Sequence, residues 1–204
     1  MLIAVEGMDG VGKTTLAKKL STELGYKYVE DPVRMLLGLS EEDYDNLCYK
    51  VWDRKYENAS AFMFCFGNIM TRSLGENVVV DRHLLSTYYW DSNEQNSKLF
   101  DIATYGQAIP DLTIVLYADI DTRISRIKSR NAEDEDLTEK MVLNEGYEKM
   151  LSFADETNIP YVVIDTTNKS IEDVYNESLI SVKNAINNAN LNTKSKTLKK
   201  IMRQ

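Results

Sequence analysis

Short apolar runs alternate with longer amphipathic stretches along this chain. The runs are rich in valine and isoleucine and lie at residues 2–5, 26–29, 78–80, 112–117 and 161–164. Strands buried on both faces of a parallel sheet have this continuous apolar character. The stretches between them repeat apolar residues at helical spacing, so strands and helices alternate. The pattern predicts an α/β fold in which a five-stranded parallel sheet carries helices on both faces.

Two of the helical patterns have recognisable ends. The first is followed by Gly25, a residue typical of helix C-terminal caps. The last is preceded by Ser170, which forms a capping-box pattern with Asp173. These signals place one helix directly after the first strand and another near the end of the chain.

The length of 204 residues fits a single domain, which we expect to span residues 1–188. A polar, basic extension at residues 189–204 favours a frayed terminal helix.

The net charge of −8 argues against nucleic acid as a partner, because a phosphate backbone needs a basic face. No apolar run is long enough to cross a membrane, and the start lacks the features of a signal peptide. The two cysteines, Cys48 and Cys65, are isolated, and we expect both to be inert packing residues. The sequence therefore favours a cytoplasmic protein with no membrane partner.

Residues 7–14 read G-M-D-G-V-G-K-T and match the phosphate-binding pattern G-x-x-x-x-G-K-[ST] in full. The glycines let backbone N–H groups turn inward around a phosphate, and the following helix directs its N-terminal dipole at the anion. Lys13 places positive charge between the β- and γ-phosphates, and the hydroxyl of Thr14 can ligate Mg²⁺. A P-loop fold is therefore predicted, with ATP bound by Gly7, Gly10, Val11, Gly12, Lys13, Thr14 and Thr15.

A P-loop occurs in kinases, GTPases and ATPases. A GTPase of the common switch type would carry D-x-x-G after a core strand and N-K-x-D for guanine. Here Asp81 is followed by R-H-L, and the N-K at residues 168–169 lacks the aspartate. A motion-coupled ATPase would need a second domain to move. Both readings are therefore less favoured than a kinase.

The apolar run at residues 78–80 ends in Asp81 and Arg82. A carboxylate at this place in a P-loop fold can bind Mg²⁺ directly or through water. An arginine at the carboxyl end of the sheet suits bidentate contact with a phosphate. The alternative is an ion pair at the surface end of a strand.

Arg123, Arg126 and Arg130 fall on one helix face and precede an acidic stretch. A basic lid at about residues 126–140 could neutralise the charge that develops during phosphoryl transfer and exclude water. The spacing alone is equally typical of a solvated charged face.

Phe64 lies on a different face of its predicted helix from Phe62 and Phe66. Aromatic residues in such a helix are more often part of a core. A nucleobase pocket also needs a flat apolar wall, so Phe64 is a candidate for base stacking.

Taken together, these motifs resemble the thymidylate kinase family within the P-loop nucleoside and nucleotide kinases, over most of the chain. The matching segments are E-G-M-D-G-V-G-K-T-T at residues 6–15, D-R-H at 81–83 followed by Ser86, P-D-L-T at 110–113, the spacing of Arg126 and Arg130, and E-G-Y at 145–147. The resemblance implies transfer of the γ-phosphate of ATP, with Mg²⁺, to a deoxynucleoside monophosphate. The acceptor it implies first is dTMP, and it further suggests a homodimer.

The resemblance also implies roles for single residues. Asp9 would contact the sugar 3′-hydroxyl, Arg82 would hold the acceptor phosphate, and Phe64 would stack on the base. Arg126 and Arg130 would be catalytic lid arginines, which fits a P-loop in which Val11 cannot supply one. The catalytic set is then Lys13, Arg82, Arg126, Arg130 and Asp9, and the metal set is Thr14 and Asp81.

The chain departs from the family pattern around the acceptor. The family's P-G-G-T segment after its E-P pair is absent, which leaves Arg34 as a substitute phosphate contact near Asp31. The base-reading arginine four positions after the stacking Phe64 is Asn68, and the glutamine near the end of the D-R helix is Asp91.

Two alternatives follow from these departures. The D-P-V at residues 31–33 resembles the E-P-V of deoxynucleoside kinases, so Asp31 could be the base that activates a nucleoside 5′-hydroxyl. A nucleotide-binding module with little turnover is the other alternative. The sequence therefore predicts Asp9, Asp31, Arg34, Phe64, Asn68 and Arg82 as substrate-binding residues and leaves the base open.

Overall fold

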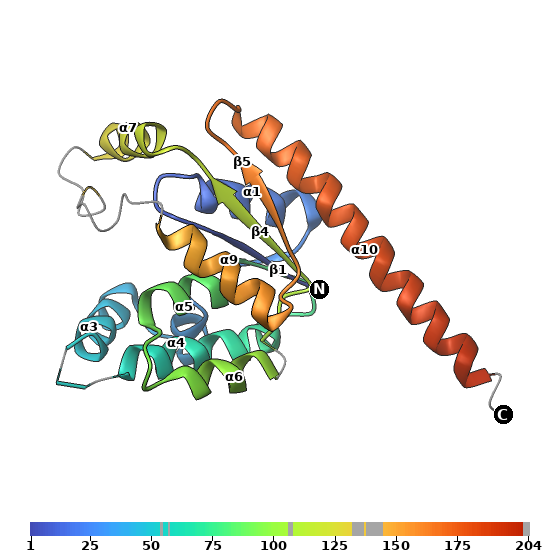
Figure 1. Cartoon of the computed structure of the whole chain (residues 1–204), viewed down its shortest axis with the longest axis horizontal. Helices are drawn as coiled ribbons and strands as arrows, with labels where there is room; N and C mark the ends of the chain where they lie inside the picture. The colour runs from blue at the N-terminus through green and yellow to red at the C-terminus, as the bar shows by residue number, and fades with distance from the viewer. Residues whose placement is uncertain (54, 57, 106–107, 132–136, 138–144, 202–204) are drawn as a thin grey trace.

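Five parallel strands form one sheet in the order β2-β3-β1-β4-β5. Figure 1 labels β1, β4 and β5. The computed structural model describes residues 1–53, 55–56, 58–105, 108–131, 137 and 145–201. The strands are β1 (Leu2–Gly7), β2 (Lys27–Val29), β3 (Val78–Asp81), β4 (Leu112–Tyr117) and β5 (Tyr161–Asp165). This confirms the predicted α/β fold with a five-stranded parallel sheet.

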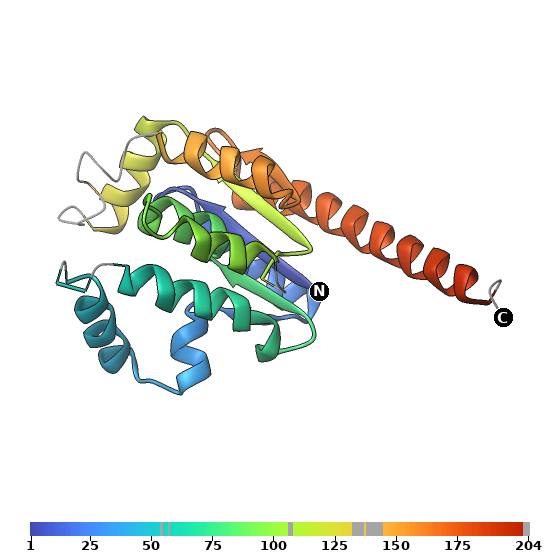
Figure 2. The ribbon, with the colours of Figure 1, turned by 60° about the horizontal axis from the view of Figure 1, so that its bottom comes forward.

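Helices cover both faces of the sheet, as Figures 1 and 2 show. They are α1 (Lys13–Leu24), α2 (Pro32–Leu37), α3 (Glu41–Val51), α4 (Ala59–Met70), α5 (Leu84–Asp91), α6 (Ser97–Tyr105), α7 (Ile120–Arg130), α9 (Glu145–Thr157) and α10 (Ile171–Ile201), with a 3₁₀ turn η1 (Thr71–Leu74) after α4. The pair α1 and α10 packs on one face, and α4, α5, α6 and α9 pack on the other.

Each face of the sheet has its own apolar core. On one face, Leu16 and Leu20 of α1 and Val182 of α10 pack against β1 and β4. On the other, Phe100 of α6 and Phe153 of α9 join the core under the sheet. Both cysteines are buried, as expected of packing residues.

The predicted helix ends are confirmed. Gly25 adopts the left-handed conformation at the end of α1 (φ 65°). The backbone N–H of Asp173 donates to Ser170 Oγ at 3.1 Å, and the N–H of Ser170 donates to Asp173 Oδ2 at 3.2 Å. These side chains hold the start of α10.

Helix α10 runs to Ile201 and projects away from the sheet (Figure 1). The extension expected at residues 189–204 therefore continues this helix up to residue 201, and residues 202–204 lie outside the described part of the chain. Of the lid expected at residues 126–140, the structure describes residues 126–131 and 137 only. Within the described residues, no helix is long and apolar enough to cross a membrane.

Candidate active site

The P-loop connects the end of β1 to the start of α1, at the middle of the sheet. Gly7 has φ 134°, and a Cβ there would lie 2.3 Å from the carbonyl oxygen of Leu116. Gly10 has φ 81°, and its Cβ would lie 2.8 Å from the carbonyl oxygen of Arg123. Both glycines are therefore required by backbone conformation and by the close approach of β4 and α7.

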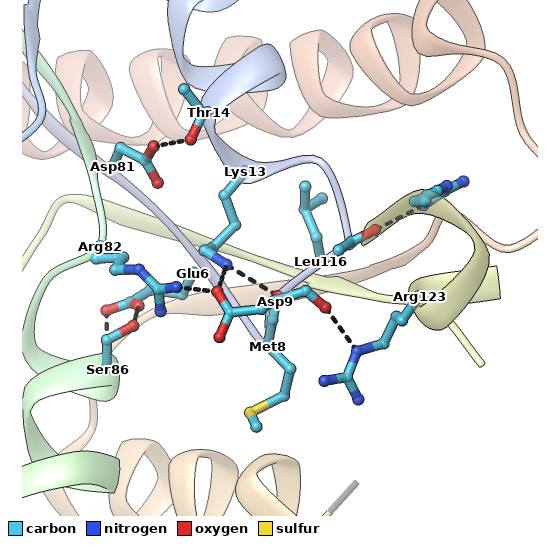
Figure 3. A network of polar contacts seen from close by, with 12 residues as sticks. Glu6, Met8, Asp9, Lys13, Thr14, Asp81, Arg82, Ser86, Leu116 and Arg123 are labelled. Carbon is cyan, nitrogen blue, oxygen red and sulfur yellow. Dashed lines mark hydrogen bonds and ion pairs between the residues drawn. The ribbon is translucent and has the colours of Figure 1, made fainter. Parts of the chain in front are cut away.

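Lys13 is buried and its amine is held within the loop. Nζ donates to the carbonyl oxygen of Met8 at 2.8 Å and lies 3.4 Å from Asp9 Oδ1 (Figure 3). Burial, together with the positive charge of Arg82, lowers the pKa of Lys13 to about 8. The ammonium that would bind phosphate thus loses its proton much more easily than an exposed lysine.

Asp9 and Arg82 form an ion pair at the centre of the site (Figure 3). Burial would raise the pKa of Asp9, but the charges of Lys13 and Arg82 outweigh it and the pKa falls below its usual value. Arg82 follows β3 with a left-handed backbone (φ 67°), unusual for arginine, and its N–H donates to the carbonyl oxygen of Val5 at 3.0 Å. Such strain is typical of functional positions.

Thr14 and Asp81 supply oxygen atoms suited to a magnesium ion. The hydroxyl of Thr14 donates to Asp81 Oδ2. The other carboxylate oxygen, Asp81 Oδ1, is buried and has no hydrogen-bond partner among the described residues. A hydroxyl beside a carboxylate with a spare buried oxygen is a donor set that Mg²⁺ accepts, with water and phosphate as further ligands.

Glu6 is a structural anchor of the site to which the sequence analysis assigned no role. It is fully buried, and Oε1 accepts the backbone N–H groups of His83 and Leu85 at 2.9 Å each. The Ser86 hydroxyl donates to Oε2 (Figure 3). Burial raises the pKa of Glu6. By tying β1 to the start of α5, Glu6 fixes the short segment between β3 and α5 on which Arg82 lies.

The three arginines of α7 do not share one environment. Arg123 is fully buried, and its Nε donates to the carbonyl oxygen of Asp9 at 2.8 Å (Figure 3). The expectation that it belongs to a basic lid face is therefore wrong, because Gly10 lets the helix approach the P-loop closely. Arg126 donates to Thr166 O at 2.7 Å and Oγ1 at 2.9 Å, while Arg130 lines the cavity beside the P-loop.

Tyr147 of α9 is a second P-loop contact that the sequence did not reveal. Its hydroxyl accepts the N–H of Met8 at 3.4 Å and donates to Leu116 O at 3.0 Å. A Cβ on the preceding Gly146 would lie 2.3 Å from Met8 Sδ. Helices α7 and α9 thus both fix the P-loop backbone.

Two cavities meet at this site. The smaller, of about 550 Å³, is lined by the P-loop, Arg126, Arg130 and Thr166. The larger, of about 910 Å³, extends between α3, α4 and α5. Asp9 and Arg82 line both. The arrangement can hold a phosphate-bearing ligand on each side of one ion pair.

Most of the predicted substrate-binding residues line the larger cavity. Asp31, Phe64 and Asn68 are among them. Phe64 packs near Trp52, with ring centroids 6.1 Å apart, whereas Phe62 and Phe66 are exposed. Arg34 is not among the described lining residues. Its Nε lies 3.4 Å from Asp31 Oδ2.

Fold and site together define a P-loop kinase, and comparisons with known proteins place the chain within that class. It matches the family model described as AAA domain over residues 3–145. It is 31% identical to a probable thymidylate kinase of Methanocaldococcus jannaschii, over 90% of this chain and 96% of that protein. The chain belongs to the thymidylate kinase family of P-loop kinases, and it is a phosphotransferase.

Other relatives carry different names. A putative adenylate kinase of Pyrococcus furiosus is 32% identical, over 91% of this chain and 86% of that protein. The structure of a deoxyadenosine kinase from M. mycoides with bound dCTP has a TM-score of 0.63 at 21% identity, over 90% of this chain and all of that one. The structural likeness bears on the fold, and together the relatives support a nucleotide kinase.

Proposed function

We propose that this chain transfers the γ-phosphoryl group of ATP to the phosphate of a deoxynucleoside monophosphate. The observation that carries the proposal is that Asp9 and Arg82 line both cavities. ATP would occupy the smaller cavity around the P-loop, and the acceptor would occupy the larger. The shared ion pair lies where the γ-phosphate and the acceptor phosphate would meet.

In this reaction an oxygen of the acceptor phosphate attacks the γ-phosphorus, the bond to the β–γ bridging oxygen breaks, and ADP leaves. The acceptor phosphate is already anionic, so no strong base is needed. Lys13 and Arg130 would neutralise negative charge, and Arg82 would hold the acceptor in line. When bound by Thr14 and Asp81, Mg²⁺ would neutralise the charge of the ATP phosphates.

Arg126 enters this proposal with a more limited role than the resemblance implies. Its guanidinium hydrogen-bonds to Thr166 and lies 3.4 Å from the carbonyl oxygen of Gly10. We propose that it borders the ATP site in this position and adds positive charge there. Asp9 would contact the sugar 3′-hydroxyl, and Phe64 would stack on the base.

The identity of the base is a finer question. The resemblance predicts dTMP, and the name of the M. jannaschii relative supports that prediction. The name of the P. furiosus relative supports another base. We therefore propose a monophosphate acceptor, and dTMP is the acceptor that the resemblance predicts.

A nucleoside acceptor is the second candidate, because one observation favours it. Asp31 lines the acceptor cavity, and burial raises its pKa, as suits a carboxylate that takes a proton from a 5′-hydroxyl. In that case Asp31 would be essential. A monophosphate acceptor needs no such base.

A panel assay separates these possibilities. Purified protein with ATP and Mg²⁺ is offered the four deoxynucleoside monophosphates and the four matching nucleosides, and ADP release is followed. We expect turnover with monophosphates, and Asp31→Asn should retain most of it. Turnover confined to nucleosides and lost in Asp31→Asn would contradict the proposal, and ATP binding without any turnover would favour a binding module.

The homodimer suggested by the resemblance stays a proposal of its own. Light scattering on the purified full chain tests it directly. We expect the mass of two chains, and the mass of one chain would contradict it.

A further inference from the structure

Two helix faces line the acceptor cavity beyond the phosphate end. On α4, Ser60, Phe64 and Asn68 follow one another at intervals of four residues and all line the cavity. On α5, Thr87 and Asp91 have the same spacing and also line it. The cavity wall thus has two levels of polar residues beside the ring of Phe64. Asn68 and Thr87 form the level nearer to the phosphate end, and Ser60 and Asp91 form the outer level.

In the level nearer to the phosphate end, a hydrogen bond joins α4 to α5. Asn68 is buried, and its Nδ2 donates to Thr87 Oγ1 at 2.9 Å. The Thr87 hydroxyl lies 3.1 Å from the carbonyl oxygen of His83 and donates to it. The Asn68 side-chain oxygen is left as the acceptor of this level.

The outer level carries a carboxyl group. Asp91 lies at the end of α5, and Leu84 at its start follows Arg82 closely. The rise of a helix separates the two ends of α5 by about 10 Å, comparable with the distance from the phosphate to the base of a nucleotide. A base stacked on Phe64 with its phosphate at Arg82 would therefore present its polar edge towards Asp91.

Asp91 is partly enclosed at the end of α5. Burial raises the pKa of Asp91, although Ser60 and the charge of Lys149 oppose this effect. A carboxyl group of this kind can accept a hydrogen bond when ionised, and can both donate and accept when neutral.

The bases differ in what they offer to such a group. Adenine, cytosine and guanine each carry an exocyclic amino group, and carboxylates accept hydrogen bonds from such groups. Thymine has a carbonyl oxygen in the place of the cytosine amino group, so a carboxylate there would face a second acceptor. A neutral carboxyl pairs with the amino group and ring nitrogen of cytosine or adenine, but equally with the carbonyl oxygen and N–H of thymine, so the discrimination comes from the ionised form.

We infer that Asp91 is a specificity residue that selects deoxynucleoside monophosphates whose base carries an exocyclic amino group over dTMP. This inference rests on the proposed function and narrows its acceptor class. It predicts that the base preference of this chain differs from the dTMP predicted by resemblance.

The test compares kcat/KM for dAMP, dCMP, dGMP and dTMP with the wild-type full chain. We expect at least one amino-bearing acceptor to exceed dTMP by about tenfold or more. In Asp91→Leu this preference should fall to within about threefold. Asp91→Asn should also weaken it, because an amide pairs with the carbonyl oxygen and adjacent N–H of thymine as well as with the amino group and ring nitrogen of cytosine or adenine. Asp101→Asn, at an exposed carboxylate of α6, is the matched control and should keep the wild-type ranking.

The outcomes separate this inference from the proposed function. If dTMP is the best monophosphate, or if Asp91→Leu keeps the wild-type ranking, the inference is overturned while the monophosphate proposal stands. If only nucleosides react, the proposed function fails and the ranking of the four nucleosides tests Asp91 in the same way. If nothing reacts, calorimetric affinities for the four monophosphates give the ranking, and thermal unfolding shows whether Asp91→Leu is folded.

Discussion

The guanidinium of Arg82 is paired with the carboxylate of Asp9, between the end of β3 and the P-loop. This contact joins the cavity around the P-loop to the larger cavity between α3, α4 and α5. Asp9 also lies 3.4 Å from Lys13 Nζ, so one carboxylate orients the two cations that would face the donor and acceptor phosphates.

A double-mutant cycle tests whether Asp9 acts through Arg82. We expect Asp9→Asn to lower kcat/KM by about 100-fold, because Arg82 loses its orientation. In Arg82→Met the same Asp9→Asn change should cost far less, since its partner is gone. Steady-state kinetics of the four proteins measure the coupling, and strictly additive losses would show that the two residues act independently.

The depressed pKa of Lys13 predicts an alkaline limit for ATP capture. Only the ammonium form attracts phosphate, and the pKa of about 8 in the free protein means that this form is lost above pH 8. Because kcat/KM reports the free enzyme, its value for ATP should fall about tenfold per pH unit above that point.

Two comparisons check that Lys13 causes this alkaline fall in kcat/KM. At saturating ATP the bound phosphates favour the ammonium, so kcat should fall only at higher pH. The guanidinium of Lys13→Arg stays protonated. The residual activity of this variant should therefore show no alkaline fall in kcat/KM for ATP. A fall that persists unchanged in Lys13→Arg would assign the titration to another group.

The buried oxygen of Asp81 predicts a specific metal defect. Replacing Asp81 by Asn keeps the shape but removes the charge, so the Mg²⁺ concentration for half-maximal activity should rise by at least about tenfold. Thr14→Ser keeps the hydroxyl and is the matched control, with a near-normal requirement. A Mg²⁺ titration at fixed ATP measures both, and an unchanged requirement in Asp81→Asn would remove Asp81 from the metal site.

The P-loop glycines should differ in their tolerance of a methyl group. Gly12 has open space around the position of a Cβ, so Gly12→Ala carries only the cost of its φ of 97°, about 1–2 kcal/mol. Gly7→Ala adds a clash with the carbonyl oxygen of Leu116 and should cost about 1–3 kcal/mol more. Urea unfolding measures both, and equal losses would mean that β4 moves aside freely.

The strands, the P-loop and the helix caps could be predicted because their signals are local. Gly25 ends α1 and Ser170 begins α10 through contacts within a few residues. The resemblance gave Asp9 and Arg82 separate substrate contacts, and their ion pair was not predicted because the two residues are far apart along the chain.

The roles of Glu6 and Arg123 could not be predicted from spacing. Glu6 accepts N–H groups from a segment 77 to 80 residues away, which no local pattern reports. Arg123 shares a helix face with Arg126 by spacing, yet it is buried because Gly10 brings the P-loop backbone against α7. A glycine at position 10 indicates that some backbone could pack closely against the P-loop, but it does not indicate that this backbone belongs to Arg123.

The identity of the labelled product tests the proposed phosphoryl transfer to a monophosphate. The protein is incubated with Mg²⁺, ATP labelled in its γ-phosphate, and a mixture of deoxynucleoside monophosphates and nucleosides, and the labelled products are separated by chromatography. We expect the label in a deoxynucleoside diphosphate. Label found only in a monophosphate, made from a nucleoside, or only in inorganic phosphate would contradict it.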